Sequence, residues 1–243
     1  GTGTAVLWRE AFGRLAFDDD APPAKEDTIF DLASLTKVIA TTPLLMQLVE
    51  RGTLGLDDPV GRYLARWRGI DREDVTIRDF LSHCGGLTAY LPFYRDHQGR
   101  AEFEAGICAL PLEYTPRTRS IYSDLGFILL AFIIQDAGAA PFDDRFATLV
   151  GQMGIVEKLQ FNPPPQWRRE TAPTERDAWR GRLLLGEVHD ENAWALGGAA
   201  GHAGLFGTAA SVGACARHVL QVLAGRTGAF ARGTLETFIA RRE

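Results

Sequence analysis

The sequence predicts a globular chain of mixed α/β type, with strand-like segments at its start and helical segments after them. Residues 4–17, "TAVLWREAFGRLAF", form short apolar stretches around Gly13, a pattern typical of two strands joined by a turn or bulge. Later segments place apolar residues at helical spacing. Because 46% of the 243 residues are hydrophobic, the chain can build a substantial core.

The first predicted helix covers residues 35–51. Its apolar side chains recur at helical spacing, and Gly52 follows as the expected C-cap. Pro43 lies inside this segment, where a proline removes a hydrogen bond and costs about 3 kcal/mol. We therefore expect a kink or two abutting helices.

Three more helices follow from local patterns. Thr76 and Asp79 have the spacing of a capping box, so a helix is expected to begin there and to end at Gly85-Gly86. Residues 123–138, "SDLGFILLAFIIQDAG", are apolar almost all round and predict a helix buried on most faces. Residues 209–225 also have helical spacing.

Two stretches between these helices have no clean period. Residues 161–181, "FNPPPQWRRETAPTERDAWRG", are rich in proline, arginine and tryptophan and predict a long ordered loop. Residues 197–207, "GGAAGHAGLFG", place four glycines three residues apart and lead into the last of these helices.

Composition excludes several classes of function. The formal charge is -5 and the arginines are scattered, so no nucleic-acid footprint is present. The three cysteines are far apart and odd in number, which indicates neither a disulfide framework nor a CxxC metal site. No apolar run reaches the roughly 18 to 20 residues that a membrane span requires. A small-molecule or peptide partner is expected.

The N-terminal sequence does not decide the cellular compartment of the protein. The start "GTGTAVLWRE" lacks the basic and apolar regions of a signal peptide, which favours the cytoplasm. A processed or cut N-terminus would look the same and would fit the periplasm or secretion.

A serine and a lysine three residues apart, Ser34 and Lys37, form an S-x-x-K pattern. On a helix the two side chains lie on one face, within reach of each other. A serine hydroxyl becomes a nucleophile when a nearby base takes its proton, and a half-buried lysine amine suits that task. By itself the pattern is weak and favours a simple helix cap, because two common residues at this spacing occur by chance in many chains. The chain has no GxSxG, HExxH, GxxxxGK[ST] or GxGxxG motif that would indicate another enzyme class.

The context of this pattern resembles the serine β-lactamase-like family, in the branch of class C β-lactamases, penicillin-binding-protein-like D,D-peptidases and esterases. The resemblance runs from about residue 12 to about residue 223, in the order and spacing of "TIFDLASLTKVIAT", "RGTLGLDDPVGRYL", "TIRDFLSHCGGLTAY" and "YSDLGFILLAFIIQDAG". It implies an α/β (α+β) fold: an antiparallel sheet backed by helices, beside a mostly helical part, with the active site between them. Residues 1–50 and about 190–243 would belong to the α/β part, and about 51–189 to the helical and loop part.

The resemblance also implies roles for individual residues. Ser34 matches the acyl-accepting serine, and Lys37 matches the lysine that holds and activates it. Tyr122 matches the tyrosine of the second family motif, Y-x-N, and could share the general-base role with Lys37. That motif here ends in Asp124 instead of asparagine. An ionised carboxylate could hold Lys37 but could not donate to a substrate amide, which favours an ester over a β-lactam.

The third family motif, K-T-G or H-x-G on a strand beside the cleft, has no clear counterpart. His202 and Gly204 fit H-x-G by letters and are substrate-binding candidates, but their context resembles the family's glycine-rich segment upstream of that motif. A tight loop near the cleft is the favoured interpretation. The chain is then expected to stop before the last strands, and one of two oxyanion donors, the Ser34 backbone N–H, would be present.

Two other polar segments are secondary candidates. His83 is expected to be a helix-end residue more than an acid or base. The segment "GEVHDENAWALGG", with His189 and Asp190, resembles a family segment near the cleft. Its polar residues are adjacent in sequence, so no metal site is expected.

The sequence therefore predicts a serine hydrolase that works through an acyl-enzyme. A small ester is the first choice of substrate, and an amide, β-lactam or D-amino-acid peptide is the second; no metal or organic cofactor is implied. The alternatives are a non-catalytic penicillin- or peptide-binding module, an inactive fragment of a longer hydrolase, and a fold in which Ser34, Lys37 and Tyr122 do not meet. The oligomeric state is left open.

Overall fold

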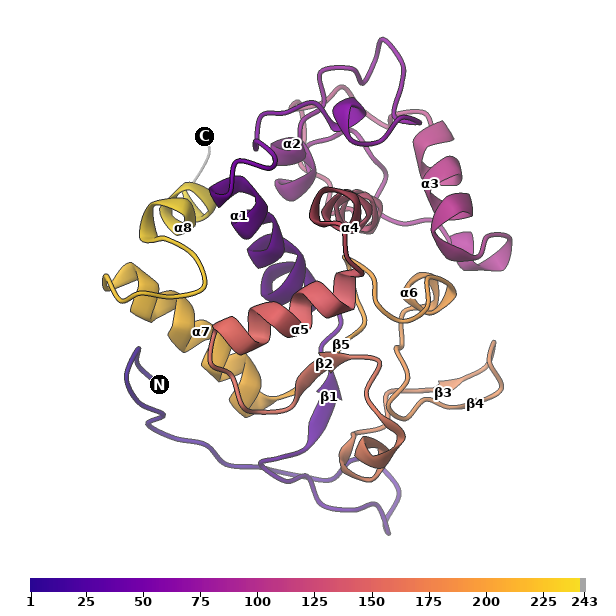
Figure 1. Cartoon of the computed structure of the whole chain (residues 1–243). Coiled ribbons are helices and arrows are strands. Elements are labelled where there is room, and N and C mark those ends of the chain that lie inside the picture. The colour runs from indigo at the N-terminus through magenta and orange to yellow at the C-terminus, as the bar shows by residue number, and fades with distance from the viewer. Residues whose placement is uncertain (241–243) are drawn as a thin grey trace.

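The computed structural model describes residues 1–240, so the last three positions of the expected α/β part lie outside the described residues. Its main sheet has three antiparallel strands in the order β1, β5, β2 (Figure 1). The strands are β1 (Ile29–Asp31), β5 (Leu205–Thr208) and β2 (Leu159–Phe161). Phe206 of the central strand pairs with Asp31 on one side and with Gln160 on the other.

Eight α-helices accompany this sheet in the described part of the chain, and most of them lie above it in the view of Figure 1. In chain order they are α1 (Thr42–Glu50), α2 (Ile77–Leu81), α3 (Gly99–Ala109), α4 (Asp124–Gly138), α5 (Phe142–Gln152), α6 (Glu191–Ala195), α7 (Ala209–Leu223) and α8 (Arg232–Ile239).

Helix α4 is the centre of the hydrophobic core. Every residue from Leu125 to Ile134 is buried, as the all-round apolar pattern predicts. Helices α1, α2, α3 and α5 pack around it (Figure 1). Because each fully buried leucine, isoleucine or phenylalanine contributes roughly 1.5–3 kcal/mol, this helix fixes the position of its own N-terminus firmly.

The expected break at Pro43 is confirmed. A π-helical segment, Lys37–Thr41, abuts α1, and Pro43 lies in the first turn of α1. A proline is tolerated there because a first-turn N–H has no intrahelical partner to lose. Gly52, with φ +68°, follows the helix as expected.

The starts of the other predicted helices are also confirmed, but α2 ends at Leu81 and not at Gly85-Gly86, because His83 with φ +59° already leaves the helical conformation. Thr76 and Asp79 form a reciprocal capping box at the start of α2. Helix α7 covers most of residues 209–225, and it begins with a second capping box, between Thr208 and Ser211.

The two strands predicted within residues 4–17 are absent from the structure, so that prediction is wrong. Within residues 1–240 the segment makes one isolated bridge, between Arg14 and Pro23. Its large apolar side chains, including Trp8 and Phe17, are exposed. A strand is stabilised by packing on a pleated face, and here no such face covers these side chains.

All three strands of the main sheet come from segments where no strand was predicted. Strand β5 forms the end of the glycine-rich run, and all four of its residues are buried. Strand β2 comes from the part assigned to helices and loops, and the division of the chain into two parts stays a prediction. The predicted long loop holds a short 3₁₀ helix, Pro165–Glu170, and a two-stranded hairpin of β3 (Arg176–Asp177) and β4 (Arg182–Leu183).

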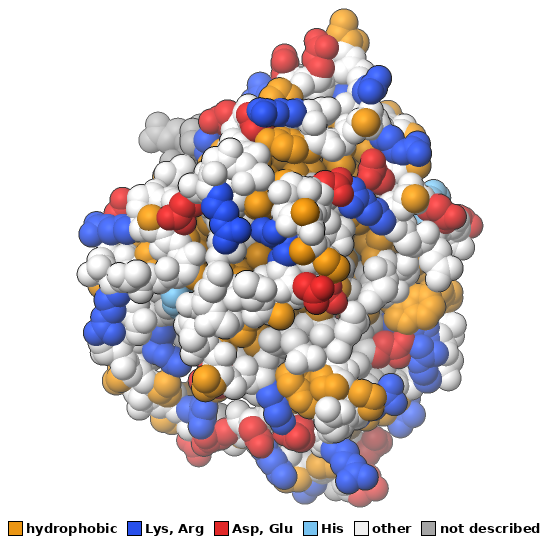
Figure 2. Space-filling model, in the orientation of Figure 1, with side chains coloured by type: hydrophobic (Ala, Val, Ile, Leu, Met, Phe, Trp, Pro, Cys, Tyr) orange, Lys and Arg blue, Asp and Glu red, His pale blue; other side chains and the backbone are white. Residues whose placement is uncertain are grey.

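The surface carries both signs of charge. In Figure 2, Lys and Arg side chains alternate with Asp and Glu over the visible face, consistent with the small net charge of -5. In the described part of the chain, no single helix has the length and hydropathy to cross a membrane; α4 and α5 pass that test jointly, with a bend of 78° between them.

Candidate active site

Ser34 lies in a tight turn between β1 and the π-helical segment. The Asp31 carboxylate accepts a hydrogen bond from the Ala33 N–H, at 2.8 Å, across this turn. Ala33 has φ +45°, a left-handed conformation that is unfavourable for a residue with a Cβ atom. The turn leaves Ser34 exposed to solvent while Lys37, one helical turn later, is buried.

The Lys37 ammonium sits among three oxygen atoms. Its Nζ lies 2.9 Å from Ser34 Oγ and 3.1 Å from the His202 carbonyl oxygen, both as hydrogen-bond acceptors. It also forms an ion pair with Asp124 Oδ1, at 2.7 Å. Only 2% of Lys37 is exposed, so water contributes little to its solvation. The protein therefore holds the amine against the serine hydroxyl.

The alternative of a simple helix cap does not describe this geometry. The Ser34 hydroxyl accepts from a side-chain amine and not from a helix N–H. Asp124 is the first residue of α4, so the buried core helix aims its carboxylate at Lys37. This is the contact that the sequence led us to expect of an aspartate at this position.

The aromatic ring of Tyr122 also contacts the Lys37 amine. The Lys37 Nζ lies 4.8 Å from the centre of the Tyr122 ring, a cation–π contact. The other neighbour of the ring is His83, with 4.5 Å between ring centres. Tyr122 is 54% exposed, so its phenol is open to an incoming molecule. Lys37 thus contacts both Ser34, by a hydrogen bond, and Tyr122, by its ring, and a role for the Tyr122 hydroxyl stays a prediction.

His83 supports this arrangement more directly than the sequence suggested. Its Nδ1 accepts a hydrogen bond of 3.0 Å from the backbone N–H of Ser123, the residue after Tyr122. The acceptor role requires the neutral ring. Burial, and then the charge of Lys37, lower the pKa of His83. The imidazole is held neutral behind Tyr122.

We expect His83 to make the stability of the folded protein depend on pH. Since its pKa is lower in the folded protein than the usual value near 6.5, the unfolded chain binds more protons, and stability falls as pH drops through this range. His83→Asn keeps an acceptor near the Nδ1 position, suits the backbone φ of +59°, and cannot titrate. The fall in Tm between pH 7.5 and 5.5 should be smaller in His83→Asn than in wild type. An equal fall in both proteins would contradict this role.

A second ionisable pair, of a buried histidine and a partly buried aspartate, lies beside the first. The His202 imidazole is 1% exposed, and its Nε2 is 2.8 Å from Asp190 Oδ1. Burial acts to raise the pKa of Asp190, but the His202 ring and the Ala193 N–H outweigh it and lower the pKa to about 2. Asp190 is therefore ionised, and the imidazole donates to it.

Asp124 of the first pair and both residues of the second pair border one small cavity of about 100 Å³. It is lined by Asp31, Ala33, Ser34, Asp124, His189, Asp190, His202 and Ala203. The cavity thus contains the nucleophile candidate and ionisable groups from four separate parts of the chain. A small polar group of a substrate would fit at this position.

Gly204 does not line this cavity, but it allows the nearby backbone to pack closely. Its φ is +110°, and a Cβ atom there would lie 2.0 Å from the Gly198 carbonyl oxygen. The close approach of these two glycines closes the loop that carries His202. A substrate-binding role for Gly204 stays a prediction.

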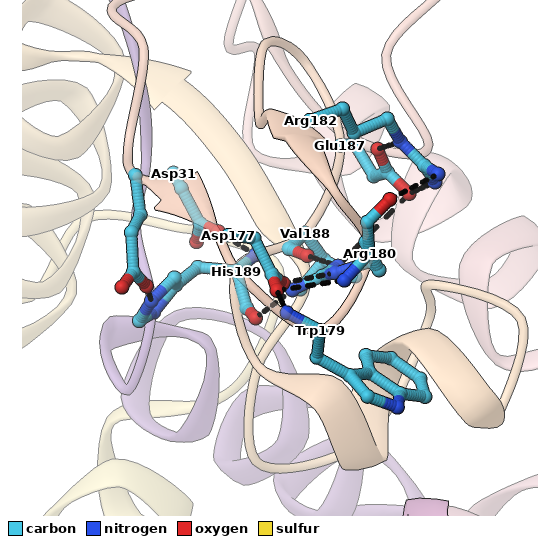
Figure 3. Close-up of polar contacts among 9 residues, drawn as sticks. Asp31, Asp177, Trp179, Arg180, Arg182, Glu187, Val188 and His189 are labelled. Atoms are coloured by element: carbon cyan, nitrogen blue, oxygen red, sulfur yellow. Dashed lines mark hydrogen bonds and ion pairs between the residues drawn. The ribbon is translucent and has the colours of Figure 1, made fainter.

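His189 and Asp190 form one wall of the site, and Arg180 holds the backbone of this segment from behind (Figure 3). The buried Arg180 guanidinium pairs with Asp177 and donates to the carbonyl oxygens of Val188 and His189, at 2.7 and 2.6 Å. The His189 N–H in turn donates to Asp31 Oδ2, at 2.7 Å. The wall is therefore tied to the turn that carries Ser34.

Asp31 is a site residue that sequence reasoning missed. Each of its oxygens accepts from a backbone N–H, of Ala33 and of His189. Burial raises the pKa of this carboxyl in spite of those hydrogen bonds. Its position three residues before Ser34 could have identified it as a candidate site residue. Asp190 was noted only as part of a segment near the cleft.

Comparison with known proteins gives consistent matches. The family model described as "Beta-lactamase" matches residues 3–243. A relative from Salmonella gallinarum, described as a "Putative D-alanyl-D-alanine carboxypeptidase", is 33% identical over 210 residues, which cover 75% of this chain and 49% of the relative. The chain thus spans about half the length of the curated relatives it matches.

Solved structures share the fold at lower identity. The penicillin-binding protein from Bacillus halodurans matches with a TM-score of 0.76 and 19% identity, over 100% of this chain and 75% of that one. A class C beta-lactamase matches with a TM-score of 0.73 and 20% identity, over 94% and 59% of the two chains.

Proposed function

Because the chain belongs to the beta-lactamase family of serine hydrolases, we propose that it transfers acyl groups through Ser34 and releases them by hydrolysis. The observation that carries this proposal is the 2.9 Å hydrogen bond between Lys37 Nζ and Ser34 Oγ, on a buried amine beside an exposed hydroxyl. A serine needs such a partner to become a nucleophile.

The proposed reaction has two steps. Ser34 Oγ attacks the substrate carbonyl carbon, its proton passes to the Lys37 and Tyr122 pair, and the leaving group departs with a proton from that pair. Water then attacks the acyl-enzyme, and the acid is released as the Ser34 hydroxyl re-forms. Asp124 holds Lys37 in place during both steps. The backbone N–H of Ser34 is one proposed donor to the developing oxyanion.

The remaining candidates are assigned to substrate binding. Asp124 and His202 line the cavity beside Ser34, while Gly204 shapes the loop behind it. We keep these three as predicted substrate-binding residues.

A small ester is our first choice of substrate. The carboxylate of Asp124 is committed to Lys37 and cannot donate to a substrate amide. A D-alanyl peptide is the second candidate, because the relatives at 32–33% identity are described as putative D-alanyl-D-alanine carboxypeptidases.

The test uses two acyl donors, p-nitrophenyl butyrate and a fluorescent penicillin, with wild type and Ser34→Ala. Turnover or labelling is expected in wild type and should be lost in Ser34→Ala. Binding of the penicillin without a covalent adduct in either protein would support a non-catalytic binding module instead. Ester turnover that is equal in the two proteins would show that Ser34 is not the nucleophile.

A further inference from the structure

The backbone of the loop that precedes β5 forms hydrogen bonds with side chains of the segment that carries Lys37. The carbonyl oxygen of Gly201 accepts from Thr41 Oγ1 at 2.6 Å, and that of His202 accepts from Lys37 Nζ at 3.1 Å. Thr36 Oγ1 accepts from the Leu205 N–H, at 3.2 Å. All three contacts are buried, so the position of this loop determines where the Lys37 amine can lie.

The same loop is fixed on its other side by a charged partner. The His202 ring donates through Nε2 to Asp190, while the ring's buried Nδ1 has no hydrogen-bond partner within residues 1–240. Asp190 itself is fixed as the N-cap of α6, where the same Oδ1 accepts from the Ala193 N–H at 2.7 Å. One side-chain hydrogen bond therefore connects the Lys37 acceptor to a rigid helix start.

We propose that Asp190 and His202 are positioning residues, which hold the His202 carbonyl against Lys37 and thereby keep its amine beside the Ser34 hydroxyl. A misplacement of about 1 Å at a catalytic group can cost 10²-fold in rate. The inference rests on the proposed function for its catalytic meaning, since the position of the Lys37 amine decides whether it can take the Ser34 proton.

Direct charge effects must be separated from positioning. Lys37 forms an ion pair with Asp124. It also interacts electrostatically with Asp190 and with His83. Removing Asp190 or His202 changes a charge as well as a hydrogen bond. The informative comparison is therefore between two variants that remove the same ionisable group and differ in the hydrogen bond.

Two such pairs are available. His202→Gln and His202→Ala both remove the imidazole, but the glutamine amide can still donate to Asp190 from near the Nε2 position. Asp190→Asn and Asp190→Ala both remove the carboxylate, but asparagine can still accept from His202 and cap α6. Tyr63→Phe, which removes a hydrogen bond to Asp58 outside the site, controls for a general loss of stability.

The measurement is the NMR signal of the Lys37 side chain at one fixed pH. The sequence has three lysines, at positions 25, 37 and 158. In a Lys25→Arg/Lys158→Arg background with ¹³Cε-labelled lysine, NMR follows a single side chain. We expect the Lys37 ¹³Cε signal to stay close to its wild-type position in His202→Gln and Asp190→Asn, and to move or broaden in His202→Ala and Asp190→Ala. Tyr63→Phe should leave it unchanged.

An equal Lys37 signal within both pairs would overturn the proposal. The NMR measurement needs no substrate, so it decides the role of Asp190 and His202 even if Ser34 is never acylated. Acylation of Ser34 is measured separately, with the fluorescent penicillin and p-nitrophenyl butyrate. There, the variants with alanine at 190 or 202 should show the lower kcat/KM of each pair.

Discussion

Replacing Lys37 with methionine should lower the rate of Ser34-dependent acylation by about 10²- to 10⁴-fold, the contribution usual for a positioned general base. The amine contacts the Ser34 hydroxyl directly, and methionine fills similar space without a base. The change also leaves Asp124 without its cation. Breaking a buried ion pair costs about 3–5 kcal/mol, and the cost here should lie at the lower end because the Asp124 side chain is 20% exposed.

Two further variants separate the chemical loss from the loss of stability. Lys37→Arg keeps a positive charge beside Asp124 but cannot give up a proton, so it should be nearly as inactive as Lys37→Met and more stable. Lys37→Met/Asp124→Asn should regain stability without activity, because no unpaired carboxylate remains. Stopped-flow acylation and thermal unfolding measure the two quantities. Acylation by Lys37→Arg at the wild-type rate would contradict the general-base role.

Gly204→Ala is expected to destabilise the protein by about 3 kcal/mol or more. The new Cβ would meet the Gly198 carbonyl at 2.0 Å, and alanine strongly disfavours a φ of +110°. Strain and overpacking each cost about 1–3 kcal/mol. At roughly 2–4 °C per kcal/mol for a chain of this size, Tm should fall by about 6–12 °C.

Gly233→Ala is the matched control for this prediction. Gly233 lies in α8, where a Cβ atom would meet nothing within 4 Å. Alanine in a helix is favoured over glycine by roughly 0.5–1 kcal/mol, so Tm should stay constant or rise slightly. Differential scanning calorimetry compares the two variants. A Gly204→Ala protein as stable as Gly233→Ala would show that the loop near His202 is not closely packed.

Long apolar runs and capping motifs in the sequence predicted several helices of the fold. The continuous apolar run of α4 and the capping box at Thr76 each identify a helix by themselves. The β-lactamase/transpeptidase-like fold expected from the ordered motifs is confirmed by the structural matches. Ser34 and Lys37 are three residues apart on one segment, so their contact follows from local geometry.

The rest depends on contacts between distant segments. Strand β5 is a four-residue strand in a glycine-rich run, too short for periodicity to reveal, and its place in the sheet comes from pairing with residues 29–31 and 159–161. The short apolar stretches of segment 4–17 resemble strands, but no pleated face of the folded protein covers their large side chains. Asp190 reaches His202 across 12 positions, and no local pattern pairs them.

The most direct test of the central claim is to locate the covalent adduct. Wild-type protein is incubated with fluorescent penicillin or p-nitrophenyl butyrate, quenched with acid, digested, and mapped by mass spectrometry. We predict a single acylated peptide carrying the acyl group on Ser34, absent from Ser34→Ala. An adduct on another residue, or no adduct from any acyl donor, would contradict the assignment of Ser34 as the nucleophile.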